Sequence, residues 1–220
     1  KNDIIEFIKL TKKKDMLPMI MFHTNENDCK SIFNTIFSKL DQEELNEYPY
    51  HYDILEKKQE LYEKYINNRE IYKSNIKVSH STNPEYFIRD KMSSYDSKEK
   101  DKYTQEITEY YQTKLHEIKK SSVEEETKTK REKNLLKEMN HFITSPDFCY
   151  QDVFQKHKDF IFTKSNEPMS GETIKSIRNE IKKTLNIKIP YESPLFQLLK
   201  RGIGIYVENQ PEEYRWILQK

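Results

Sequence analysis

Glycine is almost absent from this chain, and its scarcity restricts the fold more than any other feature. Only three glycines occur in 220 residues, at positions 171, 202 and 204. Loops that cradle phosphates need several glycines close together, because backbone amides must approach the phosphate with no Cβ in the way. The sequence therefore excludes a Walker A loop and a dinucleotide-binding fingerprint. Any nucleotide-driven chemistry would need parts that lie outside this chain.

The charge balance gives no global field that would attract a polyanion. Basic and acidic residues number 38 and 37, which leaves a formal net charge of +1. Charged residues make up 34% of the chain, against about 25% in an average domain, so we expect one compact core with solvated segments around it. The many lysines accompany a complete lack of alanine, which indicates a codon bias. They are therefore weak evidence of nucleic-acid binding.

The cysteines, histidines and apolar runs predict neither a metal site nor a membrane span. Cys29 and Cys149 are isolated thiols, as expected in a reducing, cytoplasmic compartment. The six histidines have no metal-ligand spacing, and no residue stands out as a catalytic nucleophile. The longest apolar run, residues 16–22, is too short to span a bilayer.

The first forty residues predict a helix, a buried strand and a second helix. Isoleucines recur at helical spacing over residues 4–8. Residues 17–22 are a continuous apolar run, which is typical of a strand buried on both faces. Apolar residues then recur every three or four positions from Cys29 to Leu40, which predicts an amphipathic helix. A strand followed by a core-facing helix is a unit of an α/β sheet.

Residues 41–145 have a different pattern. Two narrow apolar stripes, over residues 54–66 and 103–118, are typical of a helical hairpin or a short coiled coil. The run 119–134 is nearly all charged or small and polar, which favours a solvated helix or a disordered tip over a binding patch. We therefore expect a charged helical insertion over 41–145 that interrupts a core formed by residues 1–40 and 146–220.

The last segment predicts globular structure again. Isoleucines at helical spacing predict a helix after Ser170, and Pro194 begins a short apolar helix. A basic corner at residues 200–201 precedes a second strand, in which we expect Gly202 and Gly204 to permit close backbone approach within a sheet. A final helix from Pro211 predicts that the domain is open-ended at its C-terminus.

Two of these stretches resemble a known family. Residues 17–29, Leu-Pro-Met-Ile-Met-Phe-His-Thr-Asn-Glu-Asn-Asp-Cys, resemble the start of the second RecA-like domain of superkiller-type DExH-box RNA helicases of superfamily 2. Residues 198–215 resemble a later motif, in which a Leu-x-x-Gly-Ile-Gly strand precedes two histidines, a small loop, a proline and a Tyr-Arg helix. The antiviral DExD/H-box branch is most similar, because it carries a charged helical insertion between the two motifs. Tyr206 and Val207 replace the two histidines.

The resemblance implies an α/β fold, a partial RecA-like (P-loop NTPase-like) helicase C-terminal domain. It implies part of an ATP-dependent RNA helicase, in which this domain grips single-stranded RNA and closes against the first RecA-like domain of the same polypeptide. ATP and Mg²⁺ would be bound by the full-length enzyme and not by this fragment. The isolated chain is therefore not expected to hydrolyse ATP.

The expected RNA contacts lie in loops at the ends of the two predicted strands, where ligands of open α/β sheets bind. The candidates include two basic residues that rank lower, because they precede the second strand. The six are Thr24, Asn25, Tyr206, Asn209, Lys200 and Arg201.

Three interpretations stay open from the sequence. Thr24 and Asn25 are suited to RNA phosphates and equally to capping the following helix. The aromatic run 48–52 is suited to base stacking or to a hydrophobic junction where the insertion leaves the core. The whole chain also fits a non-enzymatic helical interaction or scaffold module, whose charged helices form the functional surface and whose small α/β core anchors them.

Overall fold

The computed structural model of the chain is helical, and the predicted α/β sheet is wrong. The structure describes residues 4–77, 83–163, 171–186, 189–190, 192–207, 212 and 215. Within these residues there are seven α-helices, one short 3₁₀ helix and no strand. The expected RecA-like domain requires a parallel sheet, so this fold class does not describe the chain.

Two compact units divide the described residues. One, here called unit 2, is continuous and covers residues 47–154. The other, unit 1, combines residues 1–46 with residues 155–220. Each unit is described below by itself.

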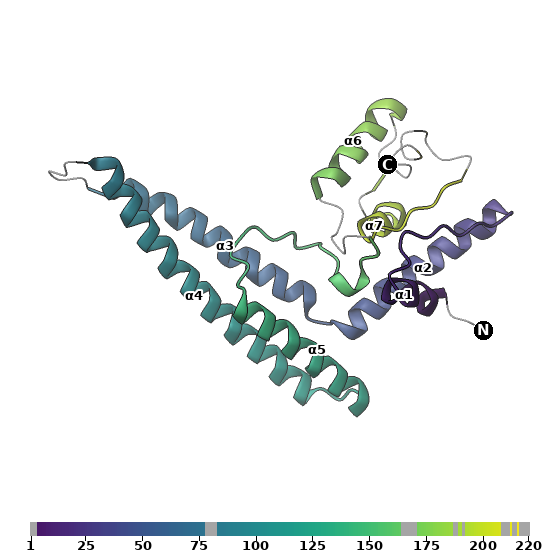
Figure 1. The fold of residues 1–220 in the computed structure, drawn as a ribbon, viewed down its shortest axis with the longest axis horizontal. Helices are drawn as coiled ribbons and strands as arrows, with labels where there is room; N and C mark the ends of the chain where they lie inside the picture. The colour runs from purple at the N-terminus through teal and green to yellow at the C-terminus, as the bar shows by residue number, and fades with distance from the viewer. Residues whose placement is uncertain are drawn as a thin grey trace. The chain divides into compact units, whose positions relative to one another are not determined.

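Unit 2 consists of three long helices: α3 (His51–Ser74), α4 (Pro84–Lys120) and α5 (Glu125–Thr144). The 37-residue α4 packs against α3 and also against α5, which lies along its C-terminal part (Figure 1). Asn83 sets the start of α4, because its side-chain oxygen accepts a hydrogen bond from the Tyr86 amide at 3.1 Å and Pro84 occupies the first helical position. Most of the charged run 119–134 is helical, because residues 119–120 end α4 and residues 125–134 begin α5.

The core of unit 2 is formed by the inward faces of these three helices. On α4 the buried residues follow one another at steps of three or four between positions 103 and 118, so they form one face of the helix. Aromatic rings fill much of the space between the helices: the centroids of Tyr103 and Phe148 lie 4.9 Å apart. The buried members are Ile54, Leu61, Tyr103, Ile107, Tyr111, Leu115, Ile118, Leu135 and Phe142.

Unit 1 contains α1 (Ile4–Lys13), α2 (Glu26–Glu47), the 3₁₀ helix η1 (Lys158–Phe160), α6 (Gly171–Leu185) and α7 (Pro194–Lys200). The amphipathic helix expected from Cys29 to Leu40 is confirmed as part of α2, which continues seven residues past the predicted boundary. The helix expected after Ser170 is confirmed as α6, and its isoleucines pack with Phe196 and Leu199 of α7.

The first predicted strand, residues 17–22, is not a strand. It joins α1 to α2 without regular secondary structure (Figure 1). Its apolar side chains are not buried on both faces: Ile20 is 77% exposed and Phe22 is 91% exposed. The apolar run was typical of a buried strand, but a strand also needs neighbouring strands, and none is present in the part of the chain that the structure describes.

The second predicted strand is replaced by the end of α7. The Gly202 and Ile203 amides donate hydrogen bonds to the carbonyls of Leu199 and Leu198, both at 2.9 Å, in the Schellman pattern that closes a helix. Gly202 has φ +79°, and a Cβ there would lie 2.6 Å from Cγ2 of Thr163. Gly202 therefore ends a helix, and the expectation that it allows close approach within a sheet is wrong.

Candidate functional site: the outer face of α5

The two candidate residues after the first predicted strand lie at the start of α2. The side-chain oxygen of Asn25 accepts hydrogen bonds from the amides of Asn27 (2.8 Å) and Asp28 (3.3 Å). These bonds satisfy two of the free N–H groups at the helix start, so the capping interpretation of Asn25 is confirmed. Thr24 is exposed beside it. An RNA contact by either residue stays a prediction.

The two basic candidates, Lys200 and Arg201, are buried. Arg201 is 0% exposed and Lys200 only 2%. The Arg201 Nη2 donates hydrogen bonds to Asp41 and to Oε2 of Glu44, the latter at 2.6 Å, and its guanidinium lies over the ring of Phe160. Because two carboxylates already surround this guanidinium in the interior of unit 1, we correct its assignment from an RNA contact to a structural ion pair.

A second cation completes this buried network. Lys156 donates a hydrogen bond to Oδ1 of Asp41 at 3.2 Å, and the His157 backbone amide donates to Oε1 of Glu44 at 2.5 Å. Burial, together with the nearby Arg201 cation, lowers the pKa of Lys156 below its usual value. The network joins the second half of α2 to residues that lie more than 100 positions later in the chain.

The remaining candidates do not assemble with these into one site. Tyr206 is 57% exposed, and Asn209 lies outside the described residues. Asn25 caps the first turn of α2, whereas Arg201 binds Asp41, sixteen residues further on, about 24 Å along the helix axis. The six residues were expected to lie together because the ends of neighbouring parallel strands meet at one edge of a sheet. The described residues form no sheet, and the candidate side chains lie apart.

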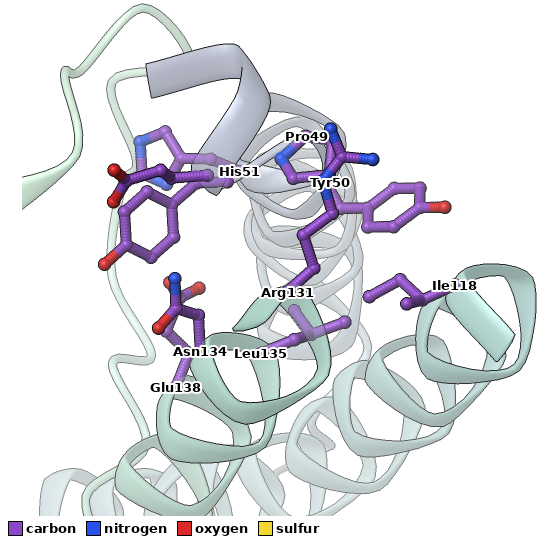
Figure 2. A pocket seen from close by; sticks show the side chains of 10 residues that line it. Pro49, Tyr50, His51, Ile118, Arg131, Asn134, Leu135 and Glu138 are labelled. Atoms are coloured by element: carbon purple, nitrogen blue, oxygen red, sulfur yellow. The ribbon is translucent and has the colours of Figure 1, made fainter. Parts of the chain in front are cut away.

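A small pocket lies in unit 2 where the start of α3 meets α4 and α5. Figure 2 shows Tyr50 and His51 on one side of it, with Arg131 and Leu135 of α5 on the other. Its cavity volume is about 10 Å³, which is room for roughly one water molecule. The aromatic run 48–52 contributes to its wall, and Tyr48 is buried. This pocket is far too small for a nucleotide or a similar substrate.

Several opposite charges on the surface of unit 2 are paired with each other. Arg69 binds Asp96 through Nε and Nη2, at 2.8 and 3.0 Å, and Lys114 lies 3.2 Å from both Asp53 and Glu117. Lys130 lies 2.9 Å from Glu47. A groove that tracks a nucleic-acid backbone presents unneutralised cations to the phosphates. The charges of Arg69, Lys114 and Lys130 are instead neutralised by carboxylates of the same unit.

Beside its core face, α5 carries an apolar line of which two residues are exposed and the third packs partly against the core. Leu135 and Phe142 point into unit 2 and are 6% and 3% exposed. Their neighbours Leu136 and Ile143 are 41% and 45% exposed, and they lie seven residues apart on a different face of the helix. Half-buried Met139 lies between them. We refer to Leu136, Met139 and Ile143 as the outer α5 line.

The sequence contained a signal for this line that the prediction missed. Leu135–Leu136 and Phe142–Ile143 are adjacent apolar pairs, and neighbouring residues on a helix point about 100° apart. One member of each pair must therefore leave the core face.

No model of a protein family, no curated protein and no solved structure matches this chain. Within the described ranges, no group of three histidines, cysteines or acidic residues is placed to hold a metal ion. None of the helices described here combines the length and the apolar character needed to cross a membrane.

Proposed function

We propose that this chain is a non-enzymatic helical interaction module, and that α5 binds an amphipathic helix of a partner protein. The observation that carries the proposal is the pair of exposed apolar residues, Leu136 and Ile143, about 100° around the helix from the face that is already packed. This is the scaffold interpretation of the sequence, with its anchoring α/β core replaced by a helical unit.

The spacing of the outer α5 line suits a helix as its ligand. Two apolar residues seven positions apart, with a third between them, form one stripe of two helical turns. A partner helix with the same spacing can lay its apolar face along this stripe, as in other helix-in-groove complexes. Met139 is half-buried and provides an unbranched, adaptable side chain at the centre of the contact.

The charges beside this line indicate the chemistry of the partner. Lys133 and Lys137 are exposed on the side of α5 that faces away from the core, next to the outer α5 line. Neither forms an ion pair with another described residue. Carboxylates on the flank of a partner helix would complement them and would guide its association. The partner is therefore an amphipathic helix with an acidic flank.

Two observations favour this function over the RNA-helicase function that the resemblance implied. The helicase domain was expected to bind RNA at the edge of a RecA-like sheet, and the described residues contain no sheet. The basic residues that would grip RNA include Arg201, which is buried against carboxylates. For these reasons we base the proposed function on α5.

A designed peptide tests the proposal. The probe is a fluorescent helix with leucines at helical spacing on one face and glutamates beside them, and its binding to the 220-residue chain is followed by anisotropy. The double variant Leu136→Glu/Ile143→Glu should weaken binding by at least about tenfold, or about 1.4 kcal/mol. Ile71→Glu is the matched control, because Ile71 is an exposed isoleucine on α3, and it should leave the affinity unchanged.

Two further measurements can contradict the proposal: peptide binding by charge-reversed variants of α5, and binding of single-stranded RNA. Lys133→Glu/Lys137→Glu should weaken the glutamate-bearing peptide and strengthen a peptide in which lysines replace the glutamates. Equal binding of both peptides by all variants would contradict the proposal. So would tight binding of single-stranded RNA that falls by orders of magnitude between about 50 and 200 mM salt, the behaviour of a backbone-gripping protein.

A further inference from the structure

The segment that joins α1 to α2 exposes several large apolar side chains. Met16, Ile20, Met21 and Phe22 are each between 48% and 91% exposed. Loops are usually polar, and runs of exposed large apolar side chains mark interaction sites. This segment belongs to unit 1 and has no residue in common with the outer α5 line.

Exposure along this segment alternates with the period of a β-strand. Leu17 and Met19 are half-buried, whereas Pro18 and Ile20 are exposed. Over residues 17–20 the odd-numbered side chains are therefore partly covered and the even-numbered ones are exposed, as in a strand with one covered face. Met21 and Phe22 are both exposed, at 48% and 91%.

The backbone of the same residues has unused hydrogen-bonding capacity. Within the described part of the chain, the C=O groups of residues 17–22, and the N–H groups of all of them except Pro18, which has none, form no hydrogen bonds. The residues on either side do: the Met16 amide bonds to Thr11 and the Asn25 amide to His23. Six residues is the usual length of a strand. An exposed row of unpaired backbone groups is a template for pairing with another strand.

We propose that residues 17–22 pair with the same residues of a second copy of this chain, as an antiparallel two-stranded ribbon that forms a homodimer. A two-fold axis at Ile20 places the two Ile20 side chains together and sets Phe22 of each copy opposite Pro18 of the other. The Phe22–Pro18 contact occurs twice and the Ile20–Ile20 contact once, on the axis, as the symmetry of a closed dimer requires. Cross-strand apolar pairs of this kind are the units that stabilise a sheet.

The flanking charges favour a second copy over an unrelated strand. Exposed Lys13 and Lys14 precede the segment, with one carboxylate, Asp15, after them. Glu26, which bonds to Lys30, and Asp28 follow the segment at the start of α2. Asp28 has 58% of its side chain exposed, and Glu26 has 32%. Antiparallel pairing about Ile20 brings the basic flank of each copy to the acidic flank of the other. The segment is thus complementary to itself in charge as well as in shape.

Sedimentation velocity of the 220-residue chain tests the dimer. Between about 10 µM and about 1 mM, the sedimentation coefficient should rise from the monomer value to the dimer value. Hydrogen exchange should show protection, only at the higher concentration, of alternate amides in this segment, either those of Ile20 and Phe22 or those of Met19 and Met21. A chain that stays monomeric over this range, or a dimer whose 19–22 amides exchange at the monomer rate, overturns the proposal.

Variants separate this contact from any other association. Ile20→Lys places two ammonium groups at the two-fold axis and should abolish the dimer, whereas the control Ile71→Lys, also at an exposed isoleucine, should not. Lys13→Glu/Lys14→Glu and Glu26→Lys/Asp28→Lys should each be monomeric alone, and an equimolar mixture should form a heterodimer. Failure of the mixture to associate, or a dimer that persists in Ile20→Lys, contradicts the pairing. Neither result bears on peptide binding by α5.

Discussion

Replacing Arg201 by methionine removes one cation from a buried cluster that also contains Asp41, Glu44 and Lys156. The guanidinium is fully buried, it bonds to both carboxylates, and Nη1 lies 3.4 Å from the Phe160 carbonyl. Methionine fills much of the same volume, so the main loss is the charge pairing and not the packing. Removing one partner of a buried ion pair costs about 3–5 kcal/mol, because the other charge stays desolvated.

That loss is large beside a typical folding free energy of about 5–15 kcal/mol. The two units prevent the use of a single unfolding free energy for the chain, so the appropriate assay is native-state hydrogen exchange, which reports each unit separately. Amides of α7 and of the second half of α2 should exchange about 150- to 4,000-fold faster in Arg201→Met. Amides of α4, in the other unit, should be unaffected.

Two further variants decide whether the reasoning holds. Adding Glu44→Gln to Arg201→Met should restore part of the stability, because the buried carboxylate without its guanidinium is then neutral. Arg89→Met, at an exposed arginine of α4, should change little. The reasoning is refuted if Arg201→Met leaves exchange in unit 1 unchanged and instead reduces RNA affinity, since Arg201 would then be the RNA contact that the sequence suggested.

Three more predictions concern the core and one turn. Burial raises the pKa values of Tyr103 and Tyr111 above the usual 10. The unfolded chain therefore loses protons first as pH rises, and unit 2 should lose about 1.4 kcal/mol of stability per tyrosine per pH unit above about pH 10. Burial also raises the pKa of Tyr65 in the same unit, so urea titrations at several pH values should show the slope lowered by about 1.4 kcal/mol per pH unit, and not removed, in Tyr111→Phe. Gly202→Ala forces a side chain into a left-handed conformation and should destabilise α7 by at least about 1–2 kcal/mol, measured by hydrogen exchange; unchanged protection would contradict the Schellman assignment. Ile107→Ala, at a fully buried site, should cost about 2–5 kcal/mol, and the same change at exposed Ile71 should cost less than about 0.5 kcal/mol in thermal unfolding.

The helices were largely predictable because their signals are local. The spacing of isoleucines predicted α6, and the apolar positions after Cys29 predicted α2. Caps contributed as well: Pro194 begins α7, and Asn25 caps α2 as one of the two alternatives proposed. Each of these signals depends on residues within one or two turns of each other, so no knowledge of the remaining chain was needed.

The two strands were wrongly predicted, and the candidate site residues do not lie together, because neither a strand nor a site is specified by local signals. A strand exists only when another strand supplies its hydrogen bonds, and residues 17–22 have apolar character without such a partner in the described chain. The six candidate RNA contacts depended on that sheet. The adjacent apolar pairs of α5 did indicate a second face, but whether Leu136 or Leu135 faces the core is decided by α4.

The sequence by itself determined that this chain has no glycine-rich phosphate loop and that most of it is amphipathic helix, because both follow from residue types and their local spacing. Only the tertiary structure decided whether Lys200 and Arg201 are exposed or buried. A lysine and an arginine beside a glycine are exposed by default, yet Arg201 is buried because Asp41, 160 positions earlier, and Glu44 are brought to it. Burial of a charge depends on partners that only folding assembles, and no local pattern contains that information.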